Sequence, residues 1–285
     1  MKEKLKSFFA AIGCLLLIMA IQVVFGMILG MIIGLVFAAK SASSGGGMDI
    51  EGIGNFVNIN MNLILILTNI VVVITFAIIY KVRKKNIKEE LQFRKTKYIN
   101  MIIAVALGLS FWIFDSGVLS IIYEAGFLKE SFSYMEELLS PITSGNLILT
   151  IISVGIIAPF VEEFIFRGVI FKILNKNISA LWSIIIQAIL FGVFHLNLIQ
   201  GGYASLMGIL FGYVTYKTKS IWPAIVMHIS NNVFACIIPL IIPESVLSTG
   251  VYIAFTIIGI IGIAVSTYVI RSKNASEEEN LEIKI

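Results

Sequence analysis

Long apolar runs separated by short polar breaks dominate the sequence. Eight runs are predicted to cross a membrane, at 8–39, 61–80, 99–123, 146–166, 178–196, 203–216, 221–242 and 249–270. Each is near the ~20 residues that an α-helix needs to cross ~30 Å of hydrocarbon, although the sixth is short. Runs of this length without alternation of apolar and polar residues favour helices over strands. The pattern therefore predicts an all-α, polytopic membrane protein with about eight transmembrane helices.

Composition agrees with this fold class and excludes an ordinary soluble protein. The chain of 285 residues is 58% hydrophobic and 13% charged, whereas soluble domains carry about 25% charged residues. The net charge of +4 does not require an acidic partner, because the placement of the basic residues accounts for it. We expect membrane lipid around the protein and no nucleic-acid partner, and the pattern leaves the oligomeric state open.

Lysine and arginine are distributed unevenly between the two sides of the predicted spans. If the spans alternate in direction, 19 of the 21 basic residues fall on the side of both termini, including Arg167, Lys172 and Lys176. The opposite side keeps only Lys40 and Lys129. Cytoplasmic loops of membrane proteins carry the excess of lysine and arginine. Both termini are therefore predicted to be cytoplasmic in a multi-pass protein of the cell membrane.

Intramembrane ionisable residues divide the chain into three regions. Such a residue costs roughly 2.5–3.5 kcal/mol at the centre of a span, so it is a functional candidate by default. Nearly all of them fall within 146–242, which we predict to be the catalytic transmembrane core. Residues 1–145 are expected to supply N-terminal transmembrane helices and loops, and residues 243–285 the last helix and a cytoplasmic tail.

Two glutamates and two histidines carry the candidate chemistry. Glu162 and Glu163 lie in PFVEEFIFRG, His195 in LFGVFHLN and His228 in PAIVMHISNN, and the chain has no other histidine. A carboxylate beside an imidazole in a low-dielectric pocket can activate water. A second imidazole with an amide can stabilise a developing oxyanion. This set meets the requirements for amide hydrolysis without a covalent nucleophile.

Helical spacing predicts which of these side chains share a face. Glu163 and Arg167 are four residues apart and can pair, which leaves Glu162, about 100° around the helix, free to face another group. A turn near 175–177 makes the fourth and fifth spans an antiparallel hairpin. Counting from that turn, the depths of Glu162 and His195 differ by only about 6 Å. We therefore expect that these two residues can meet.

Three motifs in this half resemble those of the CAAX protease and bacteriocin-processing family (CPBP, also called Abi), a family of intramembrane glutamic endopeptidases. The Ras-converting CAAX endopeptidase is the eukaryotic relative in this family. The motifs are Glu162-Glu163-x-x-x-Arg167, Phe191-x-x-x-His195 and His228-x-x-x-Asn232. The similarity covers about residues 155–235. The predicted count of eight helices is also similar to that of the family.

The resemblance implies a role for each motif residue and an intramembrane endopeptidase activity. Glu162 would be the water-activating base, assisted by His195. His228 and Asn232 would form the oxyanion site. Glu163 would hold the first motif in place together with its arginine. The implied substrates are prenylated CAAX proteins, cleaved near the C-terminus, or leader and signalling peptides.

A mechanism without a cofactor is favoured over a zinc mechanism, although the family was long called a metalloprotease. The HExxH pattern is absent, and the two histidines do not share a helical turn. Zinc would need ligands from three separate helices, so it stays the alternative.

Two other functions compete with the peptidase. In a transporter or channel the same buried charges would relay protons or bind a solute, but the sequence shows no paired broken helices and no inverted repeat. A non-catalytic immunity or scaffold protein would keep the fold and bind a partner. Substitution of Glu162 or His195 separates these functions, because only a peptidase should lose cleavage while folding normally.

Overall fold

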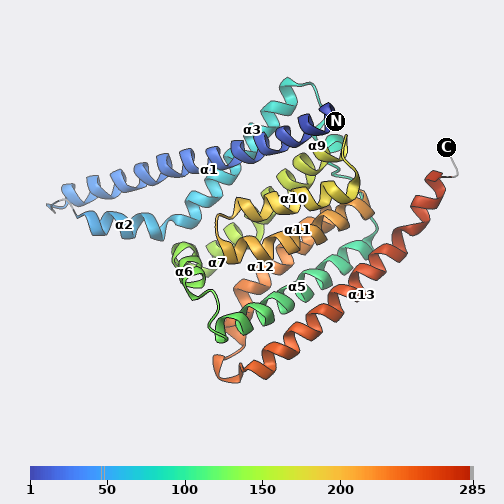
Figure 1. Ribbon diagram of the computed structural model, residues 1–285. Coiled ribbons are helices and arrows are strands. Elements are labelled where there is room, and N and C mark those ends of the chain that lie inside the picture. Colours follow the sequence, from blue (N-terminus) through green and yellow to red (C-terminus); the bar gives the residue numbers. More distant parts are fainter. Residues whose placement is uncertain (46, 48, 283–285) are drawn as a thin grey trace.

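The computed structural model describes residues 1–45, 47 and 49–282, and these residues form helices and connections without a strand (Figure 1). Seven segments of the described chain are long and apolar enough to cross a membrane: Lys2–Ser43, Met61–Val82, Tyr98–Glu124, Leu147–Asn175, Leu198–Thr218, Trp222–Ile241 and Thr249–Ala275. An eighth apolar helix, Ala180–Phe194, has only 15 residues. These segments match the eight predicted runs in order, so the all-α polytopic fold is confirmed.

The helices have the following bounds. They are α1 (Lys2–Ser43), α2 (Ile50–Ile59), α3 (Met61–Val82), α4 (Ile87–Glu90), α5 (Tyr98–Glu124), α6 (Lys129–Thr143), α7 (Leu147–Thr150), η1 (Ile151–Ile157), α8 (Ala158–Glu163), η2 (Phe164–Ile170), α9 (Phe171–Asn175), α10 (Ala180–Phe194), α11 (Leu198–Thr218), α12 (Trp222–Ile241), η3 (Glu244–Val246) and α13 (Thr249–Glu282). The elements from α7 to α9 follow one another without a break and form the fourth span. The short span is therefore the fifth, α10, and the prediction that the sixth is short was wrong, because α11 extends to 21 residues.

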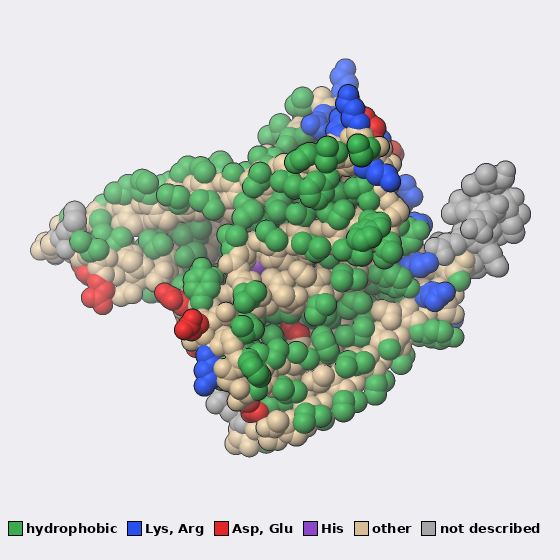
Figure 2. Space-filling view, viewed as in Figure 1, with side chains coloured by type: hydrophobic (Ala, Val, Ile, Leu, Met, Phe, Trp, Pro, Cys, Tyr) green, Lys and Arg blue, Asp and Glu red, His purple; other side chains and the backbone are tan. Residues whose placement is uncertain are grey.

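Figure 1 shows a bundle with one protruding arm. Helices α1 and α2 run side by side away from the bundle, α13 lies along α5 at the opposite edge, and α10, α11 and α12 lie between them. The beginning of α1 and the end of α13 lie at the same end of the bundle, where lysine and arginine side chains also gather (Figure 2). We call this the basic end. Which side of the membrane it faces stays a prediction.

The fourth span is longer than predicted, and this changes the position of Arg167. The helical run extends to Asn175 rather than to 166, so Arg167 lies inside it. Its side chain is fully buried, and the prediction that it belongs to the basic residues of an aqueous side was wrong. The reason is the acidic residue one turn earlier, since a guanidinium with a carboxylate partner can stay inside the protein.

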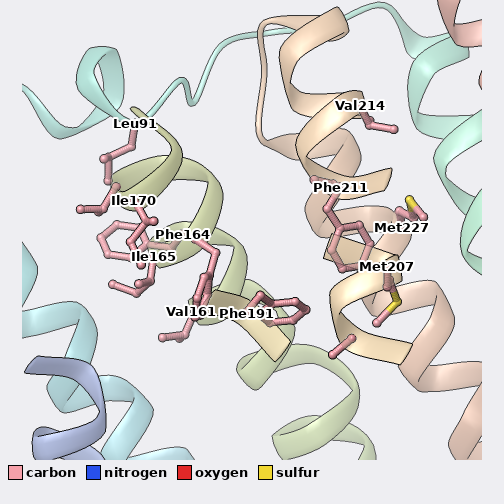
Figure 3. Close-up of a cluster of buried hydrophobic side chains, with 14 of the residues drawn as sticks. Leu91, Val161, Phe164, Ile165, Ile170, Phe191, Met207, Phe211, Val214 and Met227 are labelled. Atoms are coloured by element: carbon pink, nitrogen blue, oxygen red, sulfur yellow. The ribbon is translucent and has the colours of Figure 1, made fainter. Parts of the chain in front are cut away.

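Side chains of the fourth span form much of the hydrophobic core (Figure 3). Its buried apolar residues include Val161, Phe164, Ile165 and Ile170. Leu91, from the connection after α4, covers this group and approaches the helix at Gly168, where an added Cβ would lie 3.3 Å from the Leu91 Cβ. A second group in the same figure comes from α10, α11 and α12, and its members are Phe191, Met207, Phe211, Val214 and Met227.

The basic connection at 83–97 is docked on the bundle. The Lys172 ammonium donates to the carbonyl of Glu90 at 2.6 Å, and the Ser220 hydroxyl donates to the carbonyl of Arg94 at 2.7 Å. The backbone N–H of Ile221 donates to the carbonyl of Gln92 at 3.2 Å. The connection therefore joins the end of the fourth span to the start of α12, the two elements that carry the first and third motifs.

Candidate active site

The three motifs meet in the middle of the bundle around the carboxylate of Glu163. Its Oε1 accepts hydrogen bonds from Arg167 Nη1 and from His228 Nδ1, both at 2.9 Å. The Glu163 and Arg167 side chains are fully buried, and His228 is only 3% exposed. The predicted pairing of Glu163 with Arg167 is confirmed. The structure adds that the same carboxylate orients the third-motif histidine.

Arg167 is enclosed by polar and aromatic groups from α10 and α11. Its Nη2 donates to the carbonyl of Gly208 at 3.3 Å. Its guanidinium carbon lies 4.5 Å from the ring centre of Phe191 and 4.7 Å from that of Phe211, which are cation–π distances. Gly208 is needed for this approach, since an added Cβ would lie 3.0 Å from Ala188 and 3.3 Å from Arg167 Nη2. The first motif is thus fixed to two neighbouring helices.

Glu162 faces His228 as well. Its Oε2 lies 3.7 Å from His228 Nε2, and its side chain is 14% exposed. This distance is too long for a direct hydrogen bond. The two glutamates therefore contact the two nitrogens of one imidazole, with the buried carboxylate on Nδ1 and the more accessible one near Nε2. In Figure 2 a small histidine surface is visible in the middle of this face, separate from the acidic surface below it.

His195 directly follows α10 as its C-terminal cap. Its Nδ1 lies 2.8 Å from the carbonyl of Phe191. A carbonyl only accepts, so Nδ1 carries a proton and the neutral ring keeps a lone pair on Nε2. The Phe191 ring contacts the rings of both histidines, at centroid distances of 4.9 Å for His195 and 5.8 Å for His228. Among the described hydrogen bonds and ion pairs, the glutamates of the first motif contact His228. His195 instead contacts Phe191, whose ring also contacts His228.

Asn232 is held by an interruption in the hydrogen bonding of the fourth span. In the π-helical segment η1 the N–H of Ala158 donates to the carbonyl of Ser153, five residues earlier. The next carbonyl, that of Val154, would need a donor at position 159, but Pro159 has no N–H. Asn232 Nδ2 donates to this carbonyl at 2.9 Å. One N–H of the Asn232 amide is therefore used to join α12 to η1, and the second is left for another acceptor.

Gln187 and Phe211 belong to the site and were missed by the sequence analysis. The Gln187 amide donates to the carbonyl of Gly208 at 2.8 Å and so supports the group that binds Arg167. Phe211 stacks on His228 with ring centres 4.8 Å apart. The search considered ionisable residues, so a neutral amide in an apolar span escaped it. The polarity of Gln187 within ALWSIIIQAILFGVF was the available signal.

Metal binding was tested against the same geometry. In the described part of the chain, histidine, cysteine, aspartate and glutamate form no group of three or more that could hold a metal ion. Glu162 approaches His228, but His228 Nδ1 is bonded to Glu163 and His195 Nδ1 faces a carbonyl. This arrangement does not fit the three protein ligands of a catalytic zinc. We therefore assign no step of the reaction to a metal, and the cofactor-free mechanism stays a prediction.

Comparisons with known proteins agree with the motifs. Residues 144–234, which contain all three, match the family model described as "Type II CAAX prenyl endopeptidase Rce1-like". The chain is 34% identical over 92 residues to "Putative membrane peptidase YdiL" of Bacillus subtilis (strain 168), a stretch that is 32% of this chain and 38% of that relative. No solved structure matches the chain. The resemblance drawn from the motifs is thus confirmed: residues 144–234 of this multi-pass membrane protein are similar to the type II CAAX prenyl endopeptidase family.

Proposed function

We propose that the protein is an intramembrane endopeptidase that hydrolyses a peptide bond of a membrane-associated protein or peptide. The observation that carries this proposal is the position of Glu162, 3.7 Å from a histidine whose other nitrogen is held by the buried Glu163. The match of residues 144–234 to a CAAX endopeptidase family supports the reaction class. We assign site roles to Glu162, Glu163, Arg167, His195, His228 and Asn232.

The attacking water would be held between Glu162 Oε2 and His228 Nε2. These atoms are 3.7 Å apart, a separation that suits a water molecule hydrogen-bonded to both. Glu162 takes one proton as the water oxygen bonds to the carbonyl carbon of the substrate. The C–N bond then breaks, and Glu162 returns this proton to the leaving nitrogen. The products are a carboxyl group and an amine, and no covalent enzyme intermediate forms.

The buried groups would prepare His228 for this task. Because Glu163 accepts from His228 Nδ1, the imidazole is oriented with Nε2 toward Glu162. In its imidazolium form, with a proton on each nitrogen before the reaction and Glu163 as counter-ion, His228 would donate from Nε2 to the oxyanion of the tetrahedral intermediate. Arg167 would hold the Glu163 carboxylate in place by donating to the same Oε1. This assignment makes Glu163 and Arg167 positioning residues.

Asn232 and His195 would complete the site. The second N–H of the Asn232 amide, the one that Val154 does not use, is the proposed further oxyanion donor. His195 offers the lone pair of Nε2, since its Nδ1 proton is directed to the carbonyl of Phe191. We propose that it accepts a hydrogen bond from the water or from the leaving nitrogen and so assists Glu162.

The substrate is a membrane-associated protein or peptide in this proposal. A site inside the bundle, surrounded by apolar surface, requires a scissile bond that enters from the membrane. Two classes follow from the family resemblance: C-terminal cleavage of CAAX-type proteins and processing of leader or signalling peptides. The description of the matching family model names a CAAX prenyl endopeptidase and so supports the first class, whereas the second class rests on the motif resemblance alone.

The test compares cells that express the wild type, Glu162→Gln or His195→Ala, using mass spectrometry of newly formed protein termini in the membrane fraction. Termini that require both residues identify substrates, and the purified chain should then cleave the corresponding synthetic peptide in a chelator-insensitive reaction. General acid–base catalysis is worth about 10²- to 10⁴-fold, so we expect a loss of that size for Glu162→Gln. Glu89→Gln on α4 is the control, since Glu89 is exposed and remote from the site.

Three outcomes decide the proposal. Unchanged cleavage by both folded site variants would contradict the mechanism. If a variant loses both cleavage and the folded state, the conservative Glu162→Asp variant is tested instead. This variant must fold and must cleave more slowly than the wild type. A biological effect that survives the loss of cleavage would favour a non-catalytic scaffold instead.

A further inference from the structure

A second feature of the molecule lies away from the candidate active site. A cavity of about 760 Å³ opens at the basic end, between α1, α3 and the end of the fourth span. Its wall includes Gly13 and Leu17 of α1, Ile79 of α3, and the basic residues Arg83, Lys85 and Lys176. The described lining contains neither of the histidines nor Glu162. The cavity is therefore a separate site.

The polar part of the cavity carries an excess of positive charge. Arg83, Lys85, Lys172 and Lys176 face a single acidic residue, Glu90. The Glu90 carboxylate lies 2.7 Å from Lys172 Nζ and 3.7 Å from Lys85 Nζ. Within the described part of the chain, Arg83 and Lys176 form no salt bridge. The cavity thus presents positive charge that the protein itself does not neutralise.

The hydrogen bond from Lys172 keeps Glu90 charged. This bond holds the pKa of Glu90 below its usual range, so Glu90 is ionised at neutral pH and already compensates one of the basic groups. The remaining positive charge comes from lysine and arginine, which stay protonated across the physiological range. The attraction of the cavity for an anion therefore does not depend on a titrating group near neutrality.

The other part of the cavity is apolar and continues to the lipid-facing surface. Leu17 of α1 and Ile79 of α3 line it, and only 11% of the most apolar window of α1 is buried in the protein. Gly13 leaves an open space, since a Cβ added there would meet no atom within 4 Å. A hydrocarbon chain can therefore lie against α1 without displacing a side chain.

We propose that this cavity binds an anionic phospholipid, with the phosphate at Arg83, Lys85 and Lys176 and an acyl chain against α1 and α3. The basic rim of the cavity matches the anionic headgroup of such a molecule, and the apolar part of its wall matches an acyl chain. Anionic headgroups attract basic residues at the ends of spans. A free phosphate would use the basic rim alone and leave most of a 760 Å³ cavity without a partner.

The bound lipid would connect the arm to the helix that carries the first motif. Lys172 and Lys176 belong to the end of the fourth span or follow it directly, while Gly13 and Leu17 belong to α1. Occupancy joins these elements across the cavity. This inference does not rest on the peptidase proposal, because lipid binding can be measured on a catalytically inactive chain.

The experiment is native mass spectrometry of the full chain, purified and exchanged into neutral detergent. Phosphatidylglycerol, phosphatidylcholine and inorganic phosphate are titrated separately. We expect retention of one phosphatidylglycerol and at least about tenfold weaker binding of phosphatidylcholine. The double variant Arg83→Gln with Lys176→Gln should weaken phosphatidylglycerol by about tenfold or more, since two interfacial charges are lost. The matched control is Arg94→Gln with Lys95→Gln, which removes one arginine and one lysine exposed at the same end.

A second pair of variants tests the apolar part. Gly13→Leu fills the cavity and should reduce phosphatidylglycerol retention at least about fivefold. Gly26→Leu is its control, because Gly26 also lies on α1, also leaves space for a Cβ and does not line the cavity. Equal losses in both members of either pair would overturn the proposal. So would binding of inorganic phosphate that matches the lipid, or retention of an endogenous peptide instead of a lipid.

Discussion

The fourth span and the two outer helices respond to the same membrane in different ways. Half of the most apolar window of Leu147–Asn175 is buried within the protein, against 11% for α1 and 17% for the Thr249–Ala275 part of α13. The buried span carries Glu162, Glu163 and Arg167, whereas the outer ones are almost purely apolar in the membrane. This difference indicates that the candidate site is surrounded by protein rather than by lipid. Charged groups are retained within a span only where partners surround them.

The two kinds of helix are also held by different forces. The fourth span is tied to its neighbours by the polar contacts of Glu163, Arg167 and Val154. Helix α13 instead packs on α5 by close backbone approach, and Cβ atoms added at Gly117 or Gly259 would come within 2.6 Å of the opposite helix. Small residues allow such packing where lipid removes the hydrophobic driving force. Substitutions can therefore test the two forces separately.

The largest effect is expected for Arg167→Ala in the buried span. The change leaves the Glu163 carboxylate without its guanidinium partner, and breaking a buried pair in this way costs about 3–5 kcal/mol. Unfolding of the purified protein in mixed micelles, followed by circular dichroism, measures the loss. Lys273→Ala is the comparison, since Lys273 is exposed on α13. A similar small effect of both changes would mean that burial does not distinguish the spans.

A smaller effect is expected for Gly259→Leu on α13. An added Cβ would lie 2.5 Å from the backbone nitrogen of Phe114, so α13 must move away from α5, at about 1–3 kcal/mol for overpacking. Gly26→Leu on α1 should have almost no effect on thermal stability, because the space beside Gly26 is open. If Gly259→Leu is tolerated as well as Gly26→Leu, the outer helix is held by something other than backbone approach.

The loss of a single polar contact should be weaker again. Asn232→Ala removes the donor to the Val154 carbonyl, and hydrogen bonds between membrane helices are worth about 0.6 kcal/mol on average and up to about 1.7. The same change should reduce cleavage more than it reduces stability if the second amide N–H contacts the oxyanion. Asn58→Ala on the exposed face of α2 is the reference. Equal reductions in cleavage by both variants would remove Asn232 from the site.

The smallest effect is expected at the basic end, outside the membrane. Because the hydrogen bond from Lys172 lowers the pKa of Glu90, folding favours the ionised carboxylate. Its contribution is complete above the ordinary glutamate pKa and disappears as the pH falls through the lowered value. It should be below about 1 kcal/mol, as for other partly exposed pairs. Melting of the wild type and Glu90→Gln should differ at pH 7 and converge in acid, while Glu89→Gln shows no such convergence.

Most of the fold was predictable because lipid imposes simple rules on sequence. A span must be long and apolar, and its backbone must be hydrogen-bonded internally, so helices follow from composition and length. The same rules failed at Arg167, which looked like a residue of an aqueous side, and at the end of the fourth span. Both errors have one cause. A charged residue does not end a helix when a carboxylate one turn away accompanies it into the protein.

The candidate site was predictable in its residues and less so in its contacts. Helical spacing identified the pair of Glu163 with Arg167, since both lie on one helix face. It could not show that Glu163 also binds His228 from α12, a contact across 65 residues. From the sequence we expected that Glu162 and His195 can meet, whereas in the structure Glu162 lies near His228. Contacts between helices depend on rotation and on π-helical segments such as η1, which no periodicity reveals.

The sequence alone was enough to predict that the chain crosses a membrane, approximately where its spans lie, and that Glu162, Glu163, His195 and His228 are costly enough within them to mark a function. These properties depend on composition and local spacing. Only the tertiary structure decided which imidazole nitrogen faces which glutamate, that a proline frees the Val154 carbonyl for Asn232, and that a basic cavity opens between α1, α3 and the end of the fourth span. Such facts arise from how helices far apart in the chain pack against one another.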